Sequence, residues 1–263
     1  MAILATPVSH LFLEDKAADL IIDKSDCLEG RERMADYTLG RQLLIHFEKS
    51  IVDIWQDDEK IFIEDALNSR KELEVASFHI SSSCSEPILK DAMFYPGGRE
   101  YSREEMLFNA RSNIDWIKGI LGDRSTELAV ENNNYYTTGA YRYVTEADFI
   151  RRLVEENGIS LLFDMGHAHV TAINTGGKYE DYISLLPLDK AIQIHISKHA
   201  LDEQGNAYDA HALPDDETFA GVRDIMEKYP VRYMTVEYYK DVETLIRLLE
   251  RLRLLSEERE GIR

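Results

Sequence analysis

The amino-acid sequence predicts an α/β protein in which eight parallel strands and their helices close into one (β/α)8 TIM barrel, a single domain over residues 1–263. The length is typical of one barrel of this kind. Short apolar runs alternate with longer amphipathic stretches, which is the pattern of repeated β–α units. Several of the apolar runs end in a histidine or an acidic residue. The carboxyl ends of barrel strands surround one mouth, where barrel enzymes carry out their chemistry.

Eight apolar or alternating segments are the candidate strands, the number that a closed barrel requires. We expect their carboxyl ends to meet at the mouth. In chain order the predicted strands are Ile3–Thr6, Leu20–Ile22, Gln42–Phe47, Val75–Ile80, Glu127–Glu131, Ser160–Asp164, Ala191–His195 and Tyr233–Glu237.

Helix signals stand between the later strands. Ser102 and Glu105 fit a capping box at the start of one helix. Thr145 precedes a second amphipathic stretch, which should stop at Gly158. Near the C-terminus an apolar stripe at helical spacing predicts a helix packed on the barrel. We expect the tail that follows, Ser256–Arg263, to be solvated and frayed.

Two long loops are expected to shape the substrate site at the barrel mouth. They are Ser81–Glu100 and His199–Asp216. No Pro- or Ser-rich linker divides the chain, so the sequence indicates no second domain.

Composition limits the class of partner. The formal net charge is −19, from 49 acidic and 30 basic residues, and such a surface repels nucleic-acid phosphates. Two cysteines are too few for a disulfide framework or a thiolate zinc site. The start of the sequence does not resemble a signal peptide, and no apolar run is long enough to span a membrane. We therefore expect a cytoplasmic protein with no nucleic-acid or membrane partner.

Nine residues are candidate metal ligands, and most stand where an apolar run gives way to a polar loop. A charged or imidazole group ending a buried run is costly unless a partner compensates it. Taken singly, such a histidine can be a packing residue, and such an acid can cap a helix or form a turn. Six runs that end in ligand types together favour metal binding. The nine residues are His46, His79, Glu131, Asp164, His167, His195, Asp209, His211 and Glu237.

Imidazole and carboxylate donors without thiolate suit iron, manganese or zinc better than a soft metal. Nine donors exceed what one octahedral ion can use, and carboxylates can bridge ions. The set therefore predicts two or three divalent or trivalent ions, with iron favoured. The pairs in Asp164-x-x-His167 and Asp209-x-His211 could each grip one ion or orient one another.

The ligand pattern resembles the xylose isomerase-like TIM barrels, which include sugar isomerases, epimerases and apurinic-site endonucleases. In that superfamily the inner metal site matches Glu131, Asp164, His195 and Glu237. The remaining five candidates extend the resemblance to the trinuclear arrangement of the endonucleases. It implies that Glu131 bridges toward His46 and His79, and that a third ion is held by His167, Asp209 and His211.

A closer resemblance covers residues from about 40 to 240. The Leu-Pro-Leu-Asp run before His195, the His195-x-x-x-His199 pair and the following Asp209-x-His211 are similar to the multinuclear non-heme iron oxidative enzymes of the methanobactin-biosynthesis type. Two features differ from that family. It usually has Asn at the position of His167, and Arg-Asp where this chain has Tyr238-Tyr239.

Three enzymatic hypotheses follow. The resemblance implies an iron enzyme that uses dioxygen to modify cysteine in a peptide, often presented by a small partner protein. We expect His199 to contact the substrate there. A divalent-metal isomerase or epimerase of a sugar or sugar phosphate is the second hypothesis, with Glu131 or Glu237 moving the proton. A trinuclear zinc phosphoester hydrolase is the third. A barrel that only binds a ligand, without turnover, is the non-enzymatic alternative.

Overall fold

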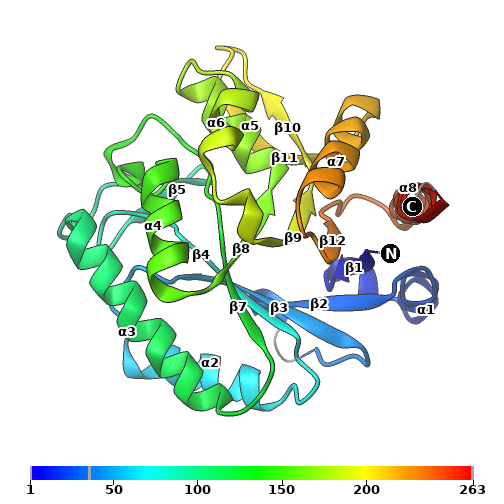
Figure 1. The fold of residues 1–263 in the computed structure, drawn as a ribbon, viewed down its shortest axis with the longest axis horizontal. Coiled ribbons are helices and arrows are strands. Elements are labelled where there is room, and N and C mark those ends of the chain that lie inside the picture. Colours follow the sequence, from blue (N-terminus) through cyan, green and yellow to red (C-terminus); the bar gives the residue numbers. More distant parts are fainter. Residues whose placement is uncertain (1, 35–36, 262–263) are drawn as a thin grey trace.

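The computed structural model describes residues 2–34 and 37–261. Among them, eight parallel strands form a closed barrel in the order β1-β2-β3-β4-β7-β8-β9-β12, with β12 returning to β1. Helices surround the barrel, and α1 and α8 lie side by side next to β1 and β2 (Figure 1). The barrel strands are β1 (Ile3–Pro7), β2 (Cys27–Arg31), β3 (Gln42–Ser50), β4 (Val75–His79), β7 (Glu127–Glu131), β8 (Ser160–Asp164), β9 (Ala191–Ile196) and β12 (Tyr233–Val236).

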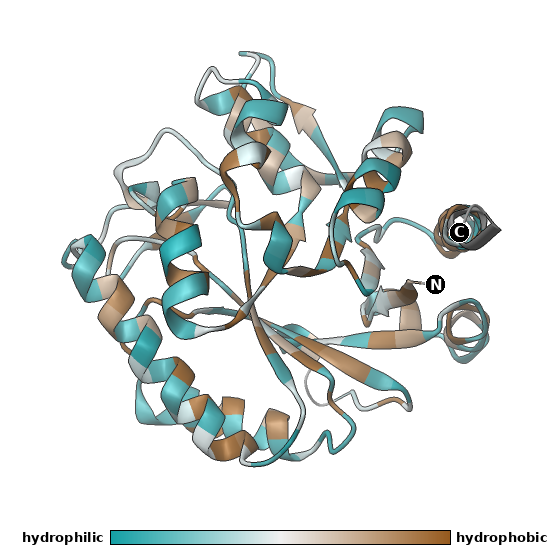
Figure 2. Cartoon of the chain, viewed as in Figure 1, coloured by the Kyte–Doolittle hydropathy of each residue, from teal (hydrophilic) through white to brown (hydrophobic). Residues whose placement is uncertain are grey.

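Helices connect the strands and cover the outside of the barrel. Their apolar residues face inward, and the hydrophilic faces turn outward (Figure 2). This is the amphipathic arrangement expected of helices packed on a buried sheet. The helices are α1 (Asp15–Lys24), α2 (Asp57–Asn68), α3 (Arg103–Leu121), α4 (Ala147–Asn157), α5 (Met165–Asn174), α6 (Tyr179–Leu185), α7 (Asp216–Lys228) and α8 (Val242–Gly261).

The (β/α)8 barrel predicted from the sequence is confirmed, and seven of the eight predicted strands overlap a barrel strand. The prediction for Leu20–Ile22 is wrong, because this segment lies inside α1. Ala18 and Ile21 are both buried, which is the spacing of one face of a helix. The true second strand, Cys27–Arg31, carries three polar or glycine positions, which hide its strand character in the sequence.

The predicted helix ends are mostly confirmed. Ser102 caps α3, and its side chain and that of Glu105 form the expected capping box. Gly158 ends α4 in the left-handed conformation, with φ 58°, which favours glycine. The second predicted helix is α4, which begins at Ala147, two residues after Thr145.

The predicted solvated tail is wrong at its start. Ser256 is buried inside α8, and its hydroxyl accepts a hydrogen bond from the Ala2 amide nitrogen at 3.1 Å. This bond ties the last helix to the first strand. Helix α8 continues to Gly261, and residues 262–263 of the predicted tail lie outside the described residues.

Each of the two long loops forms an antiparallel hairpin. The first contains β5 (Ile88–Lys90) and β6 (Met93–Tyr95), and the second contains β10 (Lys198–Leu201) and β11 (Ala207–Ala212). The second hairpin packs on α5 (Figure 1). This helix begins directly after β8, at the carboxyl end of that strand. Both loops therefore have ordered structure.

One apolar layer closes the amino-terminal end of the barrel. Every barrel strand contributes one buried residue to this layer, so the barrel has a packed floor and no open channel. The layer consists of Ala5, Cys27, Leu44, Val75, Ala129, Leu162, Ile192 and Tyr233.

The strand period of two carries the polar residues to the next interior position above this floor. Glu29 lies two residues beyond Cys27, His46 two beyond Leu44, and Glu131 two beyond Ala129. Positions that alternate along a barrel strand share the interior. The packed floor therefore places the candidate ligands inside the barrel, near the carboxyl ends of the strands.

Candidate metal centre

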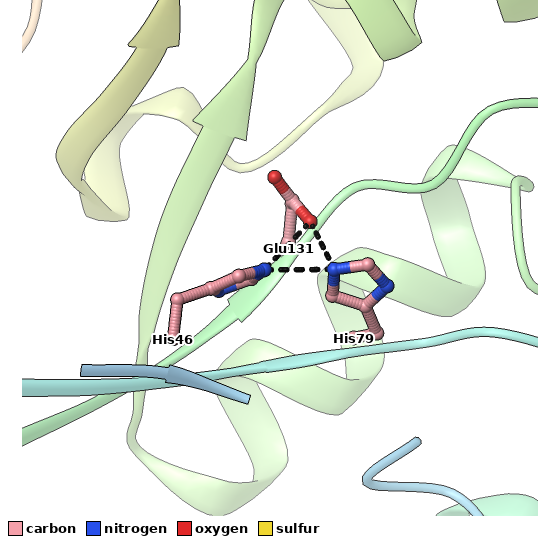
Figure 3. A group of neighbouring side chains, drawn as sticks. All are labelled: His46, His79 and Glu131. Carbon is pink, nitrogen blue, oxygen red and sulfur yellow. Dashed lines mark hydrogen bonds and ion pairs between the residues drawn. The ribbon is translucent and has the colours of Figure 1, made fainter. Parts of the chain in front are cut away.

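Three side chains from neighbouring strands meet at one side of the barrel mouth (Figure 3). His79 Nε2 lies 2.7 Å from His46 Nε2 and 3.0 Å from Glu131 Oε2. His46 Nε2 lies 3.5 Å from the same carboxylate oxygen. All three ligand atoms lie within 4.8 Å of one another, which is close enough to surround one ion.

Ser77 fixes the orientation of His46. The Ser77 hydroxyl donates to the Ile45 carbonyl at 3.3 Å, which leaves its oxygen to accept from His46 Nδ1 at 2.8 Å. With its proton on Nδ1, the ring turns the Nε2 lone pair toward His79 and Glu131. Burial, and then the charge of Arg31, hold the pKa of His46 well below its usual range. The ring is therefore neutral and ready to bind a metal at neutral pH.

A second group shares Glu131 with the first. Glu131 Oε1 lies 2.9 Å from His195 Nδ1, and Asp164 Oδ2 lies 3.9 Å from the same nitrogen. Glu131, Asp164 and His195 again offer ligand atoms that lie within 4.8 Å of one another. Because its two oxygens face different groups, Glu131 can bridge two ions.

Asp164 caps a helix and still keeps one oxygen for a ligand. Its Oδ1 accepts from the His167 amide nitrogen at 2.6 Å at the start of α5. Gly166 permits this tight turn, since a Cβ there would collide with the Ser197 hydroxyl. The other carboxylate oxygen, Oδ2, is buried and has no hydrogen-bond partner. Burial, reinforced by nearby carboxylates such as Glu131, raises the pKa of Asp164 to about 7.

The third set of predicted ligands lies beside Asp164. His167 Nε2 is 3.6 Å from Asp209 Oδ2, and His211 Nε2 is 3.3 Å from the same oxygen. His211 Nε2 also lies 3.3 Å from Glu237 Oε2. The structure thus brings all nine predicted ligands into one connected cluster. Among residues 2–34 and 37–261, two groups have all their ligand atoms within 4.8 Å of one another, one with His46 and His79 and the other with Asp164 and His195.

Nearby carboxylates raise the pKa of several histidines in this part of the cluster. Burial opposes the charged form of His195, yet Glu237 and Glu29 raise its pKa well above the usual range. Burial likewise opposes protonation of His211, but Glu237 raises its pKa to about 9. His211 has φ 41°, a strained left-handed conformation that orients its ring toward the cluster. The protons balance carboxylate charge that cations would otherwise neutralise.

Sequence reasoning missed the contribution of β2. Glu29 is fully buried, and its Oε2 lies 3.1 Å from His195 Nε2. Gln193 donates to the same Glu29 carboxylate and, at 2.9 Å, to the Thr235 hydroxyl. A carboxylate behind a histidine fixes the tautomer and strengthens the histidine as a ligand. The sequence does indicate this strand, since Cys27-Leu28-Glu29 is a short apolar run that ends in an acid. The prediction instead assigned the second strand to Leu20–Ile22.

His199 stands apart from the ligands. Its ring on β10 stacks on His169, with ring centroids 5.1 Å apart, and His169 stacks in turn on Tyr179 at 3.8 Å. His199 Nδ1 is buried without a hydrogen-bond partner. Its expected contact with the substrate stays a prediction.

A family model described as RiPP precursor modification enzyme MbnB/TglH/ChrH matches residues 63–257. Among curated proteins, the chain is similar to a UPF0276 protein of Caulobacter sp. (strain K31), with 30% identity over 133 residues, 49% of this chain and 47% of that protein. A UPF0276 protein of Bordetella pertussis is 33% identical over 110 residues, 40% of this chain and 37% of that protein. The chain thus matches about half the length of these relatives or less.

Solved structures of xylose isomerase-like proteins share the TIM-barrel fold of this chain. A xylose isomerase domain protein from Alicyclobacillus acidocaldarius has a TM-score of 0.61 at 15% identity, covering 97% of this chain and 98% of that one. The 3-keto-D-glucoside 4-epimerase YcjR from E. coli has a TM-score of 0.59 at 12% identity, covering 98% and 100%. At these identities the likeness shows the fold alone. No helix among residues 2–34 and 37–261 is long and apolar enough to cross a membrane.

Proposed function

Because the chain belongs to the RiPP precursor modification enzyme MbnB/TglH/ChrH family, we propose that it is an iron-dependent oxidative enzyme with a di- or trinuclear centre. Manganese or zinc would instead suit the isomerase or the hydrolase alternative, because zinc has no redox chemistry. The observation that carries the multinuclear proposal is Glu131. One of its oxygens faces His46 and His79, and the other faces His195. In a single-ion enzyme bound at Glu131, Asp164 and His195, the oxygen that faces His46 and His79 would have no ion to bind.

The residues present fit hard or borderline metal ions. The buried Oδ2 of Asp164 lacks any hydrogen-bond partner, which is costly unless an ion binds there. Imidazole and carboxylate donors without thiolate suit iron. Bound iron would supply the electrons and the Lewis acidity that dioxygen chemistry needs.

The surrounding residues hold each ligand in one orientation. The Ser77 hydroxyl fixes the ring of His46 through Nδ1. His167 Nδ1 donates to the Asn132 carbonyl at 2.9 Å, which leaves His167 Nε2 free to bind an ion. Asn132 also bonds the Asp164 backbone through both ends of its side-chain amide, at 2.8 and 2.9 Å. The centre is therefore preorganised by bonds from the β7 and β8 ends.

Two candidate ligands mark the accessible side of the cluster. The side chains of His79 and His211 are 28% and 35% exposed, whereas Asp164 and His195 are fully buried. Substrate therefore reaches the metals past His79 and His211, over the mouth. Tyr239 contacts the His211 ring edge-on, with centroids 5.1 Å apart, and narrows this approach.

The proposed substrate is a peptide or a small thiol, and a small partner protein presents the peptide. The net charge of −19 disfavours nucleic acid. We place the reaction in the cytoplasm.

A sugar or sugar-phosphate isomerase or epimerase is the second candidate. One ion held by Glu131, Asp164 and His195 would polarise a carbonyl beside a hydroxyl, and Glu237 could move the proton. This alternative gives His46 and His79 no metal role.

Metal counting separates the two functions. The full chain is purified without oxygen, its metals are counted, and electron paramagnetic resonance spectra are recorded before and after exposure to air. Two or three irons with a coupled signal that changes in air support the oxidative enzyme. One exchangeable Mn²⁺ or Mg²⁺ supports the isomerase, and three Zn²⁺ ions support the hydrolase; either result overturns the proposal.

A further inference from the structure

The end of β2 places a permanent cation among the proposed ligands. Arg31 Nη2 lies 2.5 Å from Glu29 Oε1 and 2.5 Å from Glu237 Oε1. The side chains of both acids are almost completely buried, and that of Arg31 is 15% exposed. The guanidinium therefore stands between two carboxylates as a bound metal ion would.

Arg31 limits what Glu237 can offer a metal. The oxygen that faces Arg31, Oε1, also accepts from the Tyr239 hydroxyl at 3.2 Å. Only Oε2 faces His211, at 3.3 Å. Glu237 thus has one oxygen available for an ion, and Arg31 and Tyr239 occupy the other.

The charges of the cluster indicate how many ions it holds. Histidines bind metals as neutral rings, so only the carboxylates and Arg31 contribute charge once the ions are bound. Arginine stays protonated in proteins. Five carboxylates and one guanidinium leave four negative charges, which two divalent ions neutralise. A third divalent ion would leave excess positive charge in a buried site. The five carboxylates are Glu29, Glu131, Asp164, Asp209 and Glu237.

We infer that the guanidinium of Arg31 takes the place of a third metal ion, and that the centre therefore holds two divalent ions. The inference rests on the proposed multinuclear function and specifies the number of metal ions in the centre as two. Arg31 is a positioning residue, since it acts through Glu29 and Glu237. Glu29 in turn accepts from His195 Nε2, so that His195 Nδ1 points to the shared Glu131.

Removal of Arg31 should create a third metal position. Its Nη2 is equidistant from two carboxylate oxygens, and ligand oxygens lie about 2.0–2.2 Å from a bound Zn²⁺ ion. A small movement of Glu29 and Glu237 would therefore enclose an ion. Alanine leaves room for the ion and its waters, whereas lysine retains a positive charge in the same place.

The experiment is a Co²⁺ titration of the metal-free full chain, with binding followed by equilibrium dialysis and visible absorption. We expect the wild type and Arg31→Lys to saturate at two Co²⁺ per chain and Arg31→Ala to saturate at three. The matched control is Arg33→Ala, two residues along the chain. Arg33 is 78% exposed and pairs with Glu48 outside the cluster, so this variant should saturate at two.

The outcomes separate this inference from the proposed function. Three ions in the wild type, or two in a folded Arg31→Ala, overturn the role of Arg31 and leave the multinuclear enzyme standing. One ion or none in the wild type overturns both. If circular dichroism shows that Arg31→Ala is unfolded, the wild type and Arg31→Lys decide. Two ions in each then support the inference, and three in either overturn it.

Discussion

The two sides of the candidate metal centre shift the pKa of a buried histidine in opposite directions. His46 faces one carboxylate, Glu131, and the cation Arg31, and its pKa lies well below the usual range because burial dominates. His195 is just as buried but faces four carboxylates within 4.0 Å, and its pKa lies well above that range. The number of carboxylates around a buried histidine thus decides whether it carries a proton.

This difference separates the roles of the two sides in metal binding. An ion that enters between His46 and His79 displaces no proton from His46. An ion that enters beside Asp164, His195 and His211 must displace the protons that those groups hold. We therefore expect the first side to load with little dependence on pH and the second to load more tightly as pH rises.

The largest expected effect comes from the residue that both sides share. Glu131→Gln removes the charge of the bridging carboxylate, so both ions should be lost or bound more than about 100-fold more weakly, since even residues behind the ligands cost 10–100-fold. Inductively coupled plasma mass spectrometry measures this loss. Glu127→Gln, at the other end of β7, is the control. Two tightly bound ions in Glu131→Gln would show that the two sides do not share a ligand.

A change at His46 should affect one side alone. His46→Ala should lose one ion per chain and retain the ion near His195, because His46 contributes to the first group only. The measurement is metal content after dialysis against the native metal. His10→Ala, at an exposed position outside both ligand groups, is the control. Full metal content in His46→Ala would remove His46 from the ligand set.

A smaller effect is expected at Glu29, which acts behind His195. Glu29→Gln removes the charge that strengthens His195 as a ligand, so the affinity for the ion on that side should fall about 10–100-fold. Zn²⁺ titration calorimetry on the metal-free protein would resolve the two binding steps. An equal loss in both steps would indicate general damage to the fold. Glu32→Gln is the matched control, because Glu32 follows Glu29 by three residues and lies just beyond the end of β2.

The pH dependence of stability should also differ with and without metal. The raised pKa of His211, about 9, gives the metal-free fold a stabilisation that is complete below pH 6.5 and is lost as pH rises through 9. Asp164, whose pKa is about 7, has the same sign: its stabilisation is complete below its ordinary pKa of 3.8 and is lost as pH rises through 7. The melting temperature of the metal-free protein should therefore fall by a few degrees between pH 6 and 9.5.

Saturating Zn²⁺ should cancel this fall, because the ions take the place of the protons. Differential scanning fluorimetry with and without Zn²⁺ measures both curves. A metal-free melting temperature that rises over this pH range would contradict the charge balance described for the carboxylate-rich side.

The smallest effect on metal binding is expected at His199. Its ring stacks on His169 and belongs to neither ligand group. His199→Ala should therefore keep full metal content, and any change should be in KM for the substrate. Loss of an ion from this variant would place His199 among the ligands and extend the carboxylate-rich side to β10.

Much of the fold and of the centre could be predicted from the sequence. The expectation that these side chains meet holds where an apolar run ends in a ligand type, as at His46, Glu131 and Asp164, because a polar group in that place is costly without a partner. Their role as metal ligands stays a prediction. The predictions failed at β2, where Glu29 and Arg31 make the strand look like a loop. The buried positive charge of Arg31 is compensated by Glu237, which lies 206 positions away in the chain. Local composition cannot reveal such a partner.

The sequence by itself determined the barrel and the chemical character of its mouth. Strand and helix periods are local properties, and ligand types at strand ends can be found without coordinates. Only the tertiary structure decided which candidate ligands lie together, which histidines have a raised pKa and where Arg31 stands. These properties depend on distances between side chains from different strands, and electrostatic energy in a buried site changes steeply with such distances.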